Sequence, residues 1–176
     1  AFYDDYCRGA LDIFAYQRFV LQPLAGLSMA ELARWHEQFM REKIEPIILP
    51  KAQALIDSHR AQRHTLMIIT ATNSFITAPI AKRLGIDTLI ATTPEQKNGV
   101  YTGDIVGVPC YREGKVERLN VWLAENEATL NGSYFYSDSH NDLPLLQRVD
   151  NPVAVDADDT LRKYAEDNGW RILSLR

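Results

Sequence analysis

The sequence predicts an α/β fold in which a parallel β-sheet carries helices on both faces, with a small helical cap and a β flap. Two observations lead to this prediction. Short apolar segments alternate with helical segments from residue 46 to residue 176, and such alternation is typical of a parallel sheet. The first 45 residues, in contrast, have the pattern of helices alone. We therefore expect a helical cap over residues 1–45 and an α/β core over residues 46–176.

The clearest helix start in the cap is at Ser28. Ser28 and Glu31 have capping-box spacing, in which the Ser oxygen and the Glu carboxylate satisfy free N–H groups of the first helical turn. Leu32, Trp35 and Phe39 follow at spacings of three and four, so they form one apolar face. Helices with such faces must pack on each other or on another part of the protein.

The core is expected to alternate strands and helices, with glycines marking a flap in the middle. Its elements are a helix over 51–60, a strand over 66–69, a helix over 75–84, a strand over 88–91, a helix over 113–127, a strand over 133–136, a short helix over 143–148, a strand over 152–155, a helix over 160–167 and a last strand over 170–173. Asn98-Gly99, Gly103 and Gly107 separate short β-type segments between the second strand and the third helix, which predicts an antiparallel flap.

Length and charge exclude several classes of protein. A chain of 176 residues buries about 70% of its unfolded surface and needs no disulfide or metal to fold. The 19 Lys and Arg against 23 Asp and Glu give a net charge of −4, which argues against nucleic-acid binding through bulk charge. Cys7 and Cys110 form neither a disulfide framework nor a zinc knuckle. Any anionic ligand must therefore be held by a few placed groups.

No segment directs the chain to a membrane. The longest uncharged stretch, residues 65–81, is too short and too polar to span a bilayer, which takes about 20 mostly apolar residues. No signal peptide is visible at the start of the sequence. We expect a cytoplasmic monomer or homodimer that acts on a small molecule, without a nucleic-acid or membrane partner. P-loop, HExxH, GxSxG and GxGxxG motifs are all absent, which removes the nucleotide hydrolases, zinc proteases and other enzymes built on them.

Thr70 ends an apolar strand just before a helix. The free N–H groups of a helix start bind anions, and the Thr70 hydroxyl adds another donor. The simpler interpretation is that Thr72 or Ser74 caps that helix.

Lys115 lies in the first turn of a helix, where the macrodipole disfavours a cation unless an anion lies nearby. The alternative is an ordinary solvated lysine on the surface.

Asp138 and Asp142 form an acidic pair, the first after a strand and the second at the next helix start. Two carboxylates at one rim repel each other unless they share a cation, and Mg²⁺ takes one or two carboxylates together with phosphate oxygens and water. The alternative is that Asp142 caps the helix while Asp138 ends a loop.

Taken together, these segments resemble motifs two, three and four of the haloacid dehalogenase (HAD) superfamily, and more narrowly its phosphoserine-phosphatase-like branch, whose helical cap comes early in the chain. The resemblance covers essentially the whole chain, and Tyr136-Ser-Asp-Ser-His-Asn-Asp-Leu-Pro-Leu-Leu is its most specific element. It implies a Rossmann-like HAD core with bound Mg²⁺. The implied site consists of catalytic and phosphate-binding Thr70 and Lys115, phosphate-binding Ala71, Thr72 and Asn141, and metal-binding Asp138 and Asp142.

One motif of that family is missing at its expected place. An apolar strand ending in Asp-x-Asp should precede the cap and supply the nucleophile, and in the family fold it lies between the strands that end at Thr70 and Asp138. Neighbouring strands lie about 4.8 Å apart, so its removal leaves a gap of about 10 Å with two unpaired edges, which should prevent stable folding. We therefore expect the sequence to be a fragment of a longer protein.

Val153-Ala-Val-Asp-Ala-Asp-Asp-Thr160 matches the missing motif in composition but follows motif four. We interpret Asp156 and Asp158 as caps of the helix that begins near Thr160, and not as a displaced nucleophile.

The resemblance implies a Mg²⁺-dependent phosphatase that hydrolyses a small phosphomonoester, such as phosphoserine or histidinol phosphate, through an aspartyl-phosphate. The 176 residues alone are expected to be inactive. Tyr16, Arg18, His36 and His140 could contact the substrate, although solvated or core positions are the simpler interpretation for each. Two alternatives remain: a non-catalytic phosphate-binding or regulatory module of the same fold, and a response-regulator receiver, whose acidic pair would have to precede the threonine.

Overall fold

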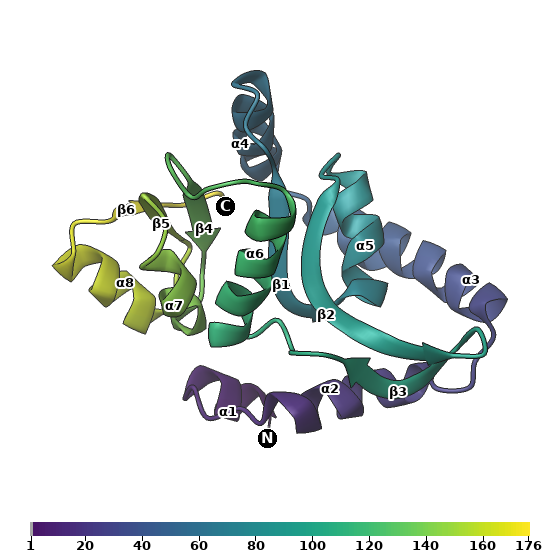
Figure 1. Cartoon of the computed structure of the whole chain (residues 1–176). Coiled ribbons are helices and arrows are strands. Elements are labelled where there is room, and N and C mark those ends of the chain that lie inside the picture. The colour runs from purple at the N-terminus through teal and green to yellow at the C-terminus, as the bar shows by residue number, and fades with distance from the viewer. Residues whose placement is uncertain (1) are drawn as a thin grey trace. The chain divides into compact units, whose positions relative to one another are not determined.

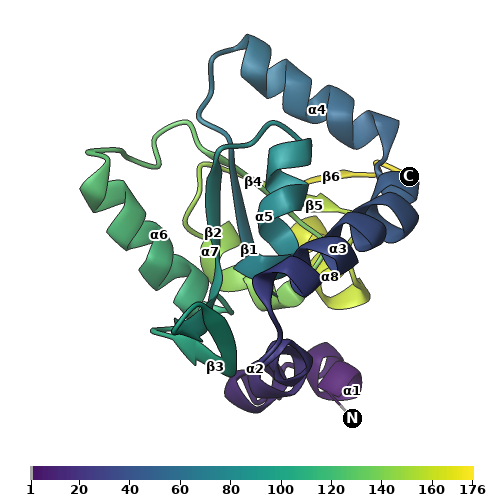
Figure 2. The same ribbon diagram turned by 90° about the vertical axis from the view of Figure 1, so that its right-hand side faces the viewer.

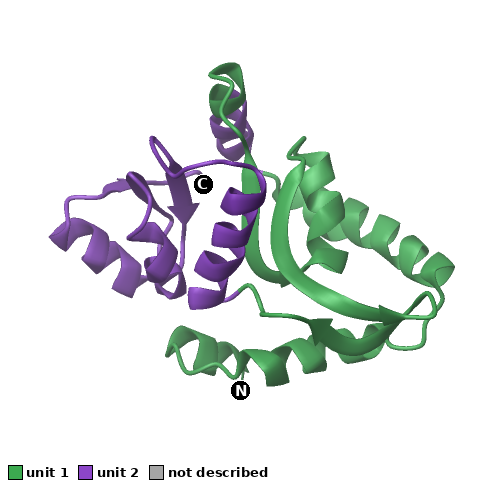
Figure 3. Cartoon of the chain, viewed as in Figure 1, with its two compact units in different colours: residues 1–48, 58–110 green, residues 49–57, 111–176 purple. Residues whose placement is uncertain are grey.

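A computed structural model describes residues 2–176 and divides the chain into two compact units. The first comprises residues 1–48 and 58–110, and the second residues 49–57 and 111–176 (Figures 1 and 3). The first unit thus joins the helical N-terminal block to a sheet. The boundary between cap and core that the sequence suggests at residue 45 stays a prediction.

The N-terminal block of the first unit is helical, as predicted. Its elements are α1 (Phe2–Cys7), α2 (Ile13–Leu21), η1 (Gln22–Leu24), α3 (Met29–Phe39), η2 (Met40–Ile44) and η3 (Glu45–Ile47). The capping box at the start of α3 is confirmed, because Ser28 Oγ accepts from the Glu31 N–H and the Glu31 carboxylate accepts from the Ser28 N–H. Asp12 caps α2 in the same way by accepting from the Ala15 N–H at 3.0 Å.

The sheet of the first unit has three strands in the order β1 (Met67–Asn73), β2 (Thr88–Lys97) and β3 (Val100–Val106). β1 and β2 are parallel and are joined through α5 (Ser74–Arg83), which packs on both (Figure 2). β2 and β3 are antiparallel and form the predicted flap. Asn98 and Gly99 make its two-residue turn with φ of 53° and 77°, left-handed values that Asn and Gly tolerate best.

The helical block and the flap share one hydrophobic core. The Gly26 N–H donates to the Tyr101 carbonyl at 3.1 Å, so the chain after α2 is bonded to β3. The buried apolar side chains of this core come from α2, η1, α3 and β3: Leu21, Leu24, Leu32 and Tyr101. The predicted apolar face of α3 is buried here only through Leu32, since Trp35 is 55% exposed.

The second unit contains a parallel three-stranded sheet in the order β4 (Tyr134–Ser137), β5 (Asn151–Val155), β6 (Arg171–Leu173). Its helical elements are α6 (Glu113–Glu125), η4 (His140–Asp142), α7 (Leu143–Leu146) and α8 (Asp159–Asp167), while α4 (Pro50–Ala61) begins in this unit and ends in the other. The buried apolar cluster joins α7, β5 and α8 through Leu146, Ala154, Ala157, Leu161 and Ala165.

The α/β class is confirmed, but the sheet is in two parts. Among residues 2–176, the strand that contains Thr70 and the strand that precedes Asp138 each pair on one side only: β1 with β2, and β4 with β5. These are the two strands between which the sequence analysis expects a further strand. Element positions agree with prediction to within a few residues, except that β2 extends to Lys97 and β3 is one strand instead of two short segments. Within residues 2–176, no helix is long and apolar enough to cross a membrane.

Candidate active site

Thr70 lies in the first unit, near the end of β1. The strand continues past it to Asn73, and its pairing with β2 shifts register between Thr70 and Asn73. The Thr70 Oγ1 accepts from the Thr72 N–H at 3.2 Å, which closes a tight turn over Ala71.

The cap of α5 is Asn73. Its side-chain oxygen accepts from the Ile76 N–H at 3.2 Å, so the alternatives that Thr72 or Ser74 caps this helix are wrong. Asn73 holds the extended backbone conformation of an N-cap, whereas Ser74 is already helical. The Thr70 hydroxyl is therefore not used in capping.

The carbonyl of Ala71 is held by two side chains. Gln17 of α2 donates its Nε2 at 2.9 Å, and Thr92 of β2 donates its Oγ1 at 3.0 Å. Thr92 in turn accepts from the Cys110 N–H at 3.0 Å. These bonds fix the turn after Thr70 from the helical block and from the sheet at once.

Gln17 is a residue that the sequence analysis missed. It is only 1% exposed, and its Oε1 is buried without a hydrogen-bond partner among the described residues. The signal was its position four residues before Leu21, on the apolar face of α2, where a glutamine requires a polar partner. Of the cap residues that the sequence singles out, Arg18 is exposed and Tyr16 packs edge-on against Phe2 with ring centroids 5.6 Å apart.

His36, the third cap candidate, stacks on Phe75 with ring centroids 4.5 Å apart. Its Nε2 is buried without a hydrogen-bond partner among the described residues. Burial lowers the pKa of His36 below its ordinary 6.5, and a backbone hydrogen bond at Ile76 offsets part of that effect. His36 therefore packs between α3 and α5 in an environment that favours the neutral ring.

Lys115 and Asp142 form a buried ion pair in the second unit. The Lys115 Nζ lies 2.5 Å from Asp142 Oδ1, and the two side chains are 8% and 10% exposed. The second carboxylate oxygen, Oδ2, accepts from Ser137 Oγ at 2.7 Å. A cation on one oxygen and a hydroxyl donor on the other offset part of the cost of taking this carboxylate out of water.

This geometry decides between the interpretations of both residues. Lys115 is not a solvated lysine, and the anion that its place in the first turn of α6 predicts is Asp142. Asp142 precedes α7, but its side chain makes no capping hydrogen bond, so the capping alternative is wrong. The lysine draws the carboxylate away from the helix N–H groups, because a charge-assisted contact is stronger than a cap.

Asn141 is buried beside this pair in the sequence and is held in place from two directions. Its Oδ1 accepts from the Tyr111 hydroxyl at 2.9 Å, and its backbone N–H donates to Ser139 Oγ at 3.2 Å. Ser139 in turn donates its N–H to Ser137 Oγ at 3.2 Å. Ser137 and Tyr111 are thus supporting residues that the sequence analysis did not name. Hydrogen bonds among Ser137, Ser139 and Asn141 thus brace the loop 138–142.

Asp138 differs from these buried neighbours. Its side chain is exposed, and the carboxylate has no hydrogen-bond or ion-pair partner among residues 2–176. The free carboxylate of Asp138 suits a hard cation such as Mg²⁺, which keeps several waters. Asp142 would have to share with the cation an oxygen that already contacts Lys115 or Ser137. The described part of the chain contains no cluster of three or more acidic, His or Cys side chains, so the protein supplies few ligands of its own here.

The predicted site residues are thus assigned to two units. Thr70, Ala71 and Thr72 lie in the first, while the second contains Lys115, Asp138, Asn141 and Asp142. Within the second unit, the ion pair joins the start of α6 to the loop after β4.

The string that imitates a nucleophile motif has a structural role, as predicted for Asp158. Asp158 caps α8 by accepting from the Leu161 N–H at 2.8 Å. Asp156 does not cap: its carboxylate accepts from Ser174 Oγ at 2.6 Å and from the Leu175 N–H at 3.0 Å. The prediction that both residues cap the helix is therefore right for one and wrong for the other.

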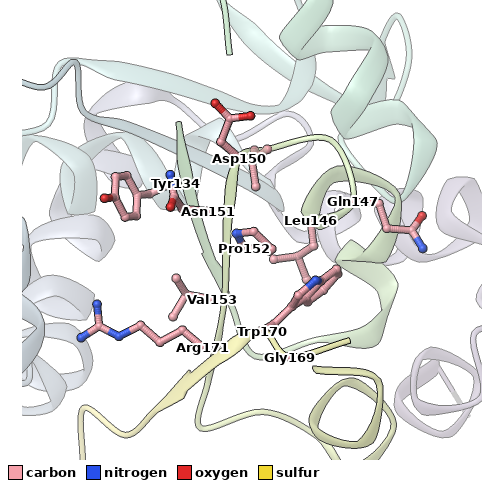
Figure 4. A pocket seen from close by; sticks show the side chains of 11 residues that line it. Tyr134, Leu146, Gln147, Asp150, Asn151, Pro152, Val153, Gly169, Trp170 and Arg171 are labelled. Carbon is pink, nitrogen blue, oxygen red and sulfur yellow. The ribbon is translucent and has the colours of Figure 1, made fainter. Parts of the chain in front are cut away.

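A hollow of about 510 Å³ lies in the second unit, and Figure 4 shows the side chains that line it. It is lined at the amino ends of β4, β5 and β6 by residues such as Tyr134, Asn151 and Arg171. In parallel sheets the reactive groups gather at the carboxyl ends of strands, where Asp138 follows β4. The hollow contains none of the predicted site residues, so it is not the candidate active site.

Comparisons with known proteins show that the chain is similar to α/β enzymes that hydrolyse phosphate esters. A family model for haloacid dehalogenase-like hydrolases matches residues 4–147. A histidinol-phosphatase of Neisseria meningitidis serogroup C is 46% identical, over 99% of this chain and 81% of its own length. The chain belongs to the haloacid dehalogenase-like hydrolase family. The resemblance drawn from the motifs is confirmed, and membership of a hydrolase family excludes the receiver alternative.

Three further comparisons describe one more relative by sequence and two solved structures that share the fold. The phosphoserine phosphatase SerB1 of Mycobacterium tuberculosis is 33% identical over 94% of this chain, which spans about half (54%) of that relative's length. A crystal structure of a protein of unknown function from Bordetella pertussis Tohama I has a TM-score of 0.93 at 45% identity, over 99% of this chain and 80% of that one. A substrate-bound phosphoserine phosphatase shares the fold, with a TM-score of 0.71 at 16% identity, over 99% of this chain and 78% of its own.

Proposed function

We propose that the protein is a Mg²⁺-dependent phosphatase that hydrolyses a small phosphomonoester of the amino-acid or amino-alcohol type. One observation supports this above all: Asp142, the partner of the buried Lys115, and Asp138, with its free carboxylate, belong to the same loop after β4. A lysine shielded from water is a strong partner for phosphoryl oxygens, and a free carboxylate in that loop is available to a cation.

The proposed division of labour follows from the chemistry of each group. Lys115 offsets the negative charge of the transferring phosphoryl group, while the Thr70 hydroxyl and the backbone N–H groups of Ala71 and Thr72 fix its orientation. Asn141, held by Tyr111, supports the phosphate. Asp138 and Asp142 hold Mg²⁺, which when bound neutralises charge on the phosphoryl oxygens.

The nucleophile is proposed to be an aspartate outside the 176 residues. Its carboxylate attacks phosphorus, the P–O bond to the substrate breaks, and the leaving oxygen takes a proton from the second aspartate of the same Asp-x-Asp motif. Water then hydrolyses the aspartyl-phosphate, which releases inorganic phosphate and restores the carboxylate. Asp156 and Asp158 do not suit this role, because the carboxylate oxygens of both already accept hydrogen bonds within the fold. The 176-residue chain alone should therefore bind phosphate without turnover.

For the substrate we propose histidinol phosphate first and phosphoserine second. Both names come from relatives, and the histidinol-phosphatase is the more similar of the two. Each compound joins a phosphate to a short amino-alcohol skeleton, so a site for one differs from a site for the other mainly in the group beyond the ester. We further propose that the enzyme works in the cytoplasm as a monomer or homodimer, without a nucleic-acid or membrane partner.

The test is phosphate release by the whole protein from histidinol phosphate, phosphoserine and an aryl phosphate, with and without Mg²⁺. We expect Mg²⁺-dependent release, a higher kcat/KM for histidinol phosphate than for phosphoserine, and a loss of orders of magnitude in Lys115→Ala. Lys163→Ala, which removes an exposed lysine of the same unit, is the matched control and should behave as wild type. Full activity in Lys115→Ala would rule the assignment out. Phosphate binding without turnover by the whole protein would favour the non-catalytic alternative.

A further inference from the structure

Asp158 does more than cap a helix. One carboxylate oxygen, Oδ1, accepts from the Leu161 N–H at 2.8 Å and so starts α8. The other, Oδ2, accepts from the backbone N–H of His140 at 2.8 Å and lies 2.9 Å from Nδ1 of the same histidine. Since a cap needs only one oxygen, the second is committed to the loop that follows β4.

The backbone of Asp158 is bonded to the same loop. Its N–H donates to the carbonyl of Asp138 at 2.9 Å. Asp158 therefore holds the chain at Asp138 and again at His140, on either side of Ser139. All of these residues belong to the second unit, and one of them, Asp138, is a proposed Mg²⁺ ligand, as is Asp142 at the end of the same loop.

Asp138 needs such support from its surroundings. Its own side chain is exposed and contacts no partner within residues 2–176, so the direction in which the carboxylate points depends on the backbone. A ligand carboxylate that is free to move loses affinity for a cation, and outer-shell groups that orient ligands are commonly worth 10- to 100-fold in metal affinity, as a rough range.

We propose that Asp158 is a positioning residue for the metal loop: by clamping Asp138 and His140 from the start of α8, it sets the direction of the Asp138 carboxylate. This inference rests on the proposed function, in which Asp138 binds Mg²⁺. It gives Asp158 a role in the chemistry that differs from that of the nucleophile which the string Asp156-Ala-Asp158 imitates.

A single substitution separates the side-chain part of the clamp, the contacts with His140, from the cap, while the backbone bond from Asp158 to Asp138 remains. Asn is as good an N-cap as Asp, so Asp158→Asn can keep the bond to Leu161. Its amide group cannot accept from the His140 N–H, because it is itself a donor. Asp156 offers a matched control two residues away. Asp156→Asn changes the same residue type in the same turn, but Asp156 bonds Ser174 and Leu175 and leaves the loop untouched.

The experiment measures cation binding directly, with Mn²⁺ in place of Mg²⁺ because both take octahedral oxygen ligands and free Mn²⁺ can be counted by electron paramagnetic resonance. The whole protein, Asp158→Asn and Asp156→Asn are titrated in parallel, and the unfolding temperature of each is recorded. Asp158→Asn should weaken Mn²⁺ binding by about tenfold or more. Asp156→Asn should stay within about twofold of wild type. His140→Ala, which removes the ring but keeps the backbone N–H, should fall between them.

The outcomes separate this inference from the proposed function. If the wild-type protein binds no Mn²⁺, the proposed metal site is wrong. If it does bind, and Asp158→Asn binds equally well, the metal site stands and the positioning role is wrong. A lower unfolding temperature with unchanged affinity would likewise reduce Asp158 to a helix cap. Should Asp158→Asn fail to fold, Asp158→Ser replaces it, since serine also caps, and failure of both to fold would overturn the inference.

Discussion

At the scale of single residues, the loop after β4 combines a buried ion pair with an exposed carboxylate. Lys115 is surrounded by protein and compensated by Asp142, whereas Asp138 is open to solvent. A lysine held in this way loses little freedom when an anion arrives, because its position is already fixed. If the proposed function holds, the stability of the second unit and its chemistry depend on the same two side chains.

Mutation can separate the contribution of this pair to stability from its contribution to activity. Lys115→Met leaves the Asp142 carboxylate buried without its cation and should cost about 3–5 kcal/mol of unfolding free energy. Adding Asp142→Leu should restore most of the stability, since an apolar pair of similar volume is tolerated. Both variants should lack phosphatase activity. Urea denaturation followed by circular dichroism measures the first effect, and a single variant as stable as wild type would contradict it.

His36 should make the first unit sensitive to acid. Its pKa is lowered by burial in the folded state, so the unfolded chain binds a proton more readily as the pH falls below the ordinary value of 6.5. Stability contributed by the neutral ring is complete above that value and declines below it. His36→Gln, which cannot titrate, should show a smaller drop in unfolding temperature between pH 8 and pH 5. Parallel curves for the two proteins would show that His36 is not responsible.

At the scale of elements, the start of α5 determines the shape of the turn after Thr70. Asn73 caps the helix, and the turn that precedes it is closed by the bond from the Thr72 N–H to Thr70. Losing the cap should loosen the helix start and the turn, because Asn73 is both the last residue of β1 and the N-cap of α5.

Asn73→Ala should therefore destabilise the protein by about 1 kcal/mol, the usual worth of an N-cap. Ser74→Ala is the control, because Ser74 is the neighbouring residue that the sequence suggests as an alternative cap and that makes no capping bond in the structure. Thermal unfolding of the two variants distinguishes them. An equal loss in both would mean that the assignment of the cap is wrong.

Sequence alone was sufficient for the order and type of the elements, because the alternation of apolar and helical segments is a local property. It also identified Lys115 and Asp142, but not that they form a pair, since the partner of a lysine depends on how the chain folds. Gln17 was missed for a related reason: its partner, the carbonyl of Ala71, is a backbone atom and leaves no mark in the sequence. The cap of α5 was misassigned because three consecutive residues, Thr72, Asn73 and Ser74, are all of types that cap helices well.

At the scale of the whole molecule, the chain has two hydrophobic cores that share no residue. One joins the helical block to the flap, and the other joins α7, β5 and α8. The strands that end near Thr70 and Asp138 belong to different sheets. Cooperative unfolding requires a common core, and the described residues give each unit its own.

We therefore expect the 176-residue chain to unfold in more than one step. Hydrogen exchange followed by mass spectrometry in increasing urea should show peptides from β2 and from β5 losing protection at different concentrations. Coincident loss in the two peptides would indicate that the units behave as one cooperative body. The comparison needs no activity and so is independent of the proposed function.

The continuity of β2 has a mechanical consequence. Its first half pairs with β1 and its second half with β3, so the flap hairpin and the core of the first unit are built on one strand, whose pairing with β3 is irregular between Pro94 and Gln96. The change of partner falls at Thr92 and Thr93, and Thr92 is fully buried with its hydroxyl on the Ala71 carbonyl. We therefore expect a displacement of the hairpin to reach the turn after Thr70 through the hydrogen bond between Thr92 and Ala71.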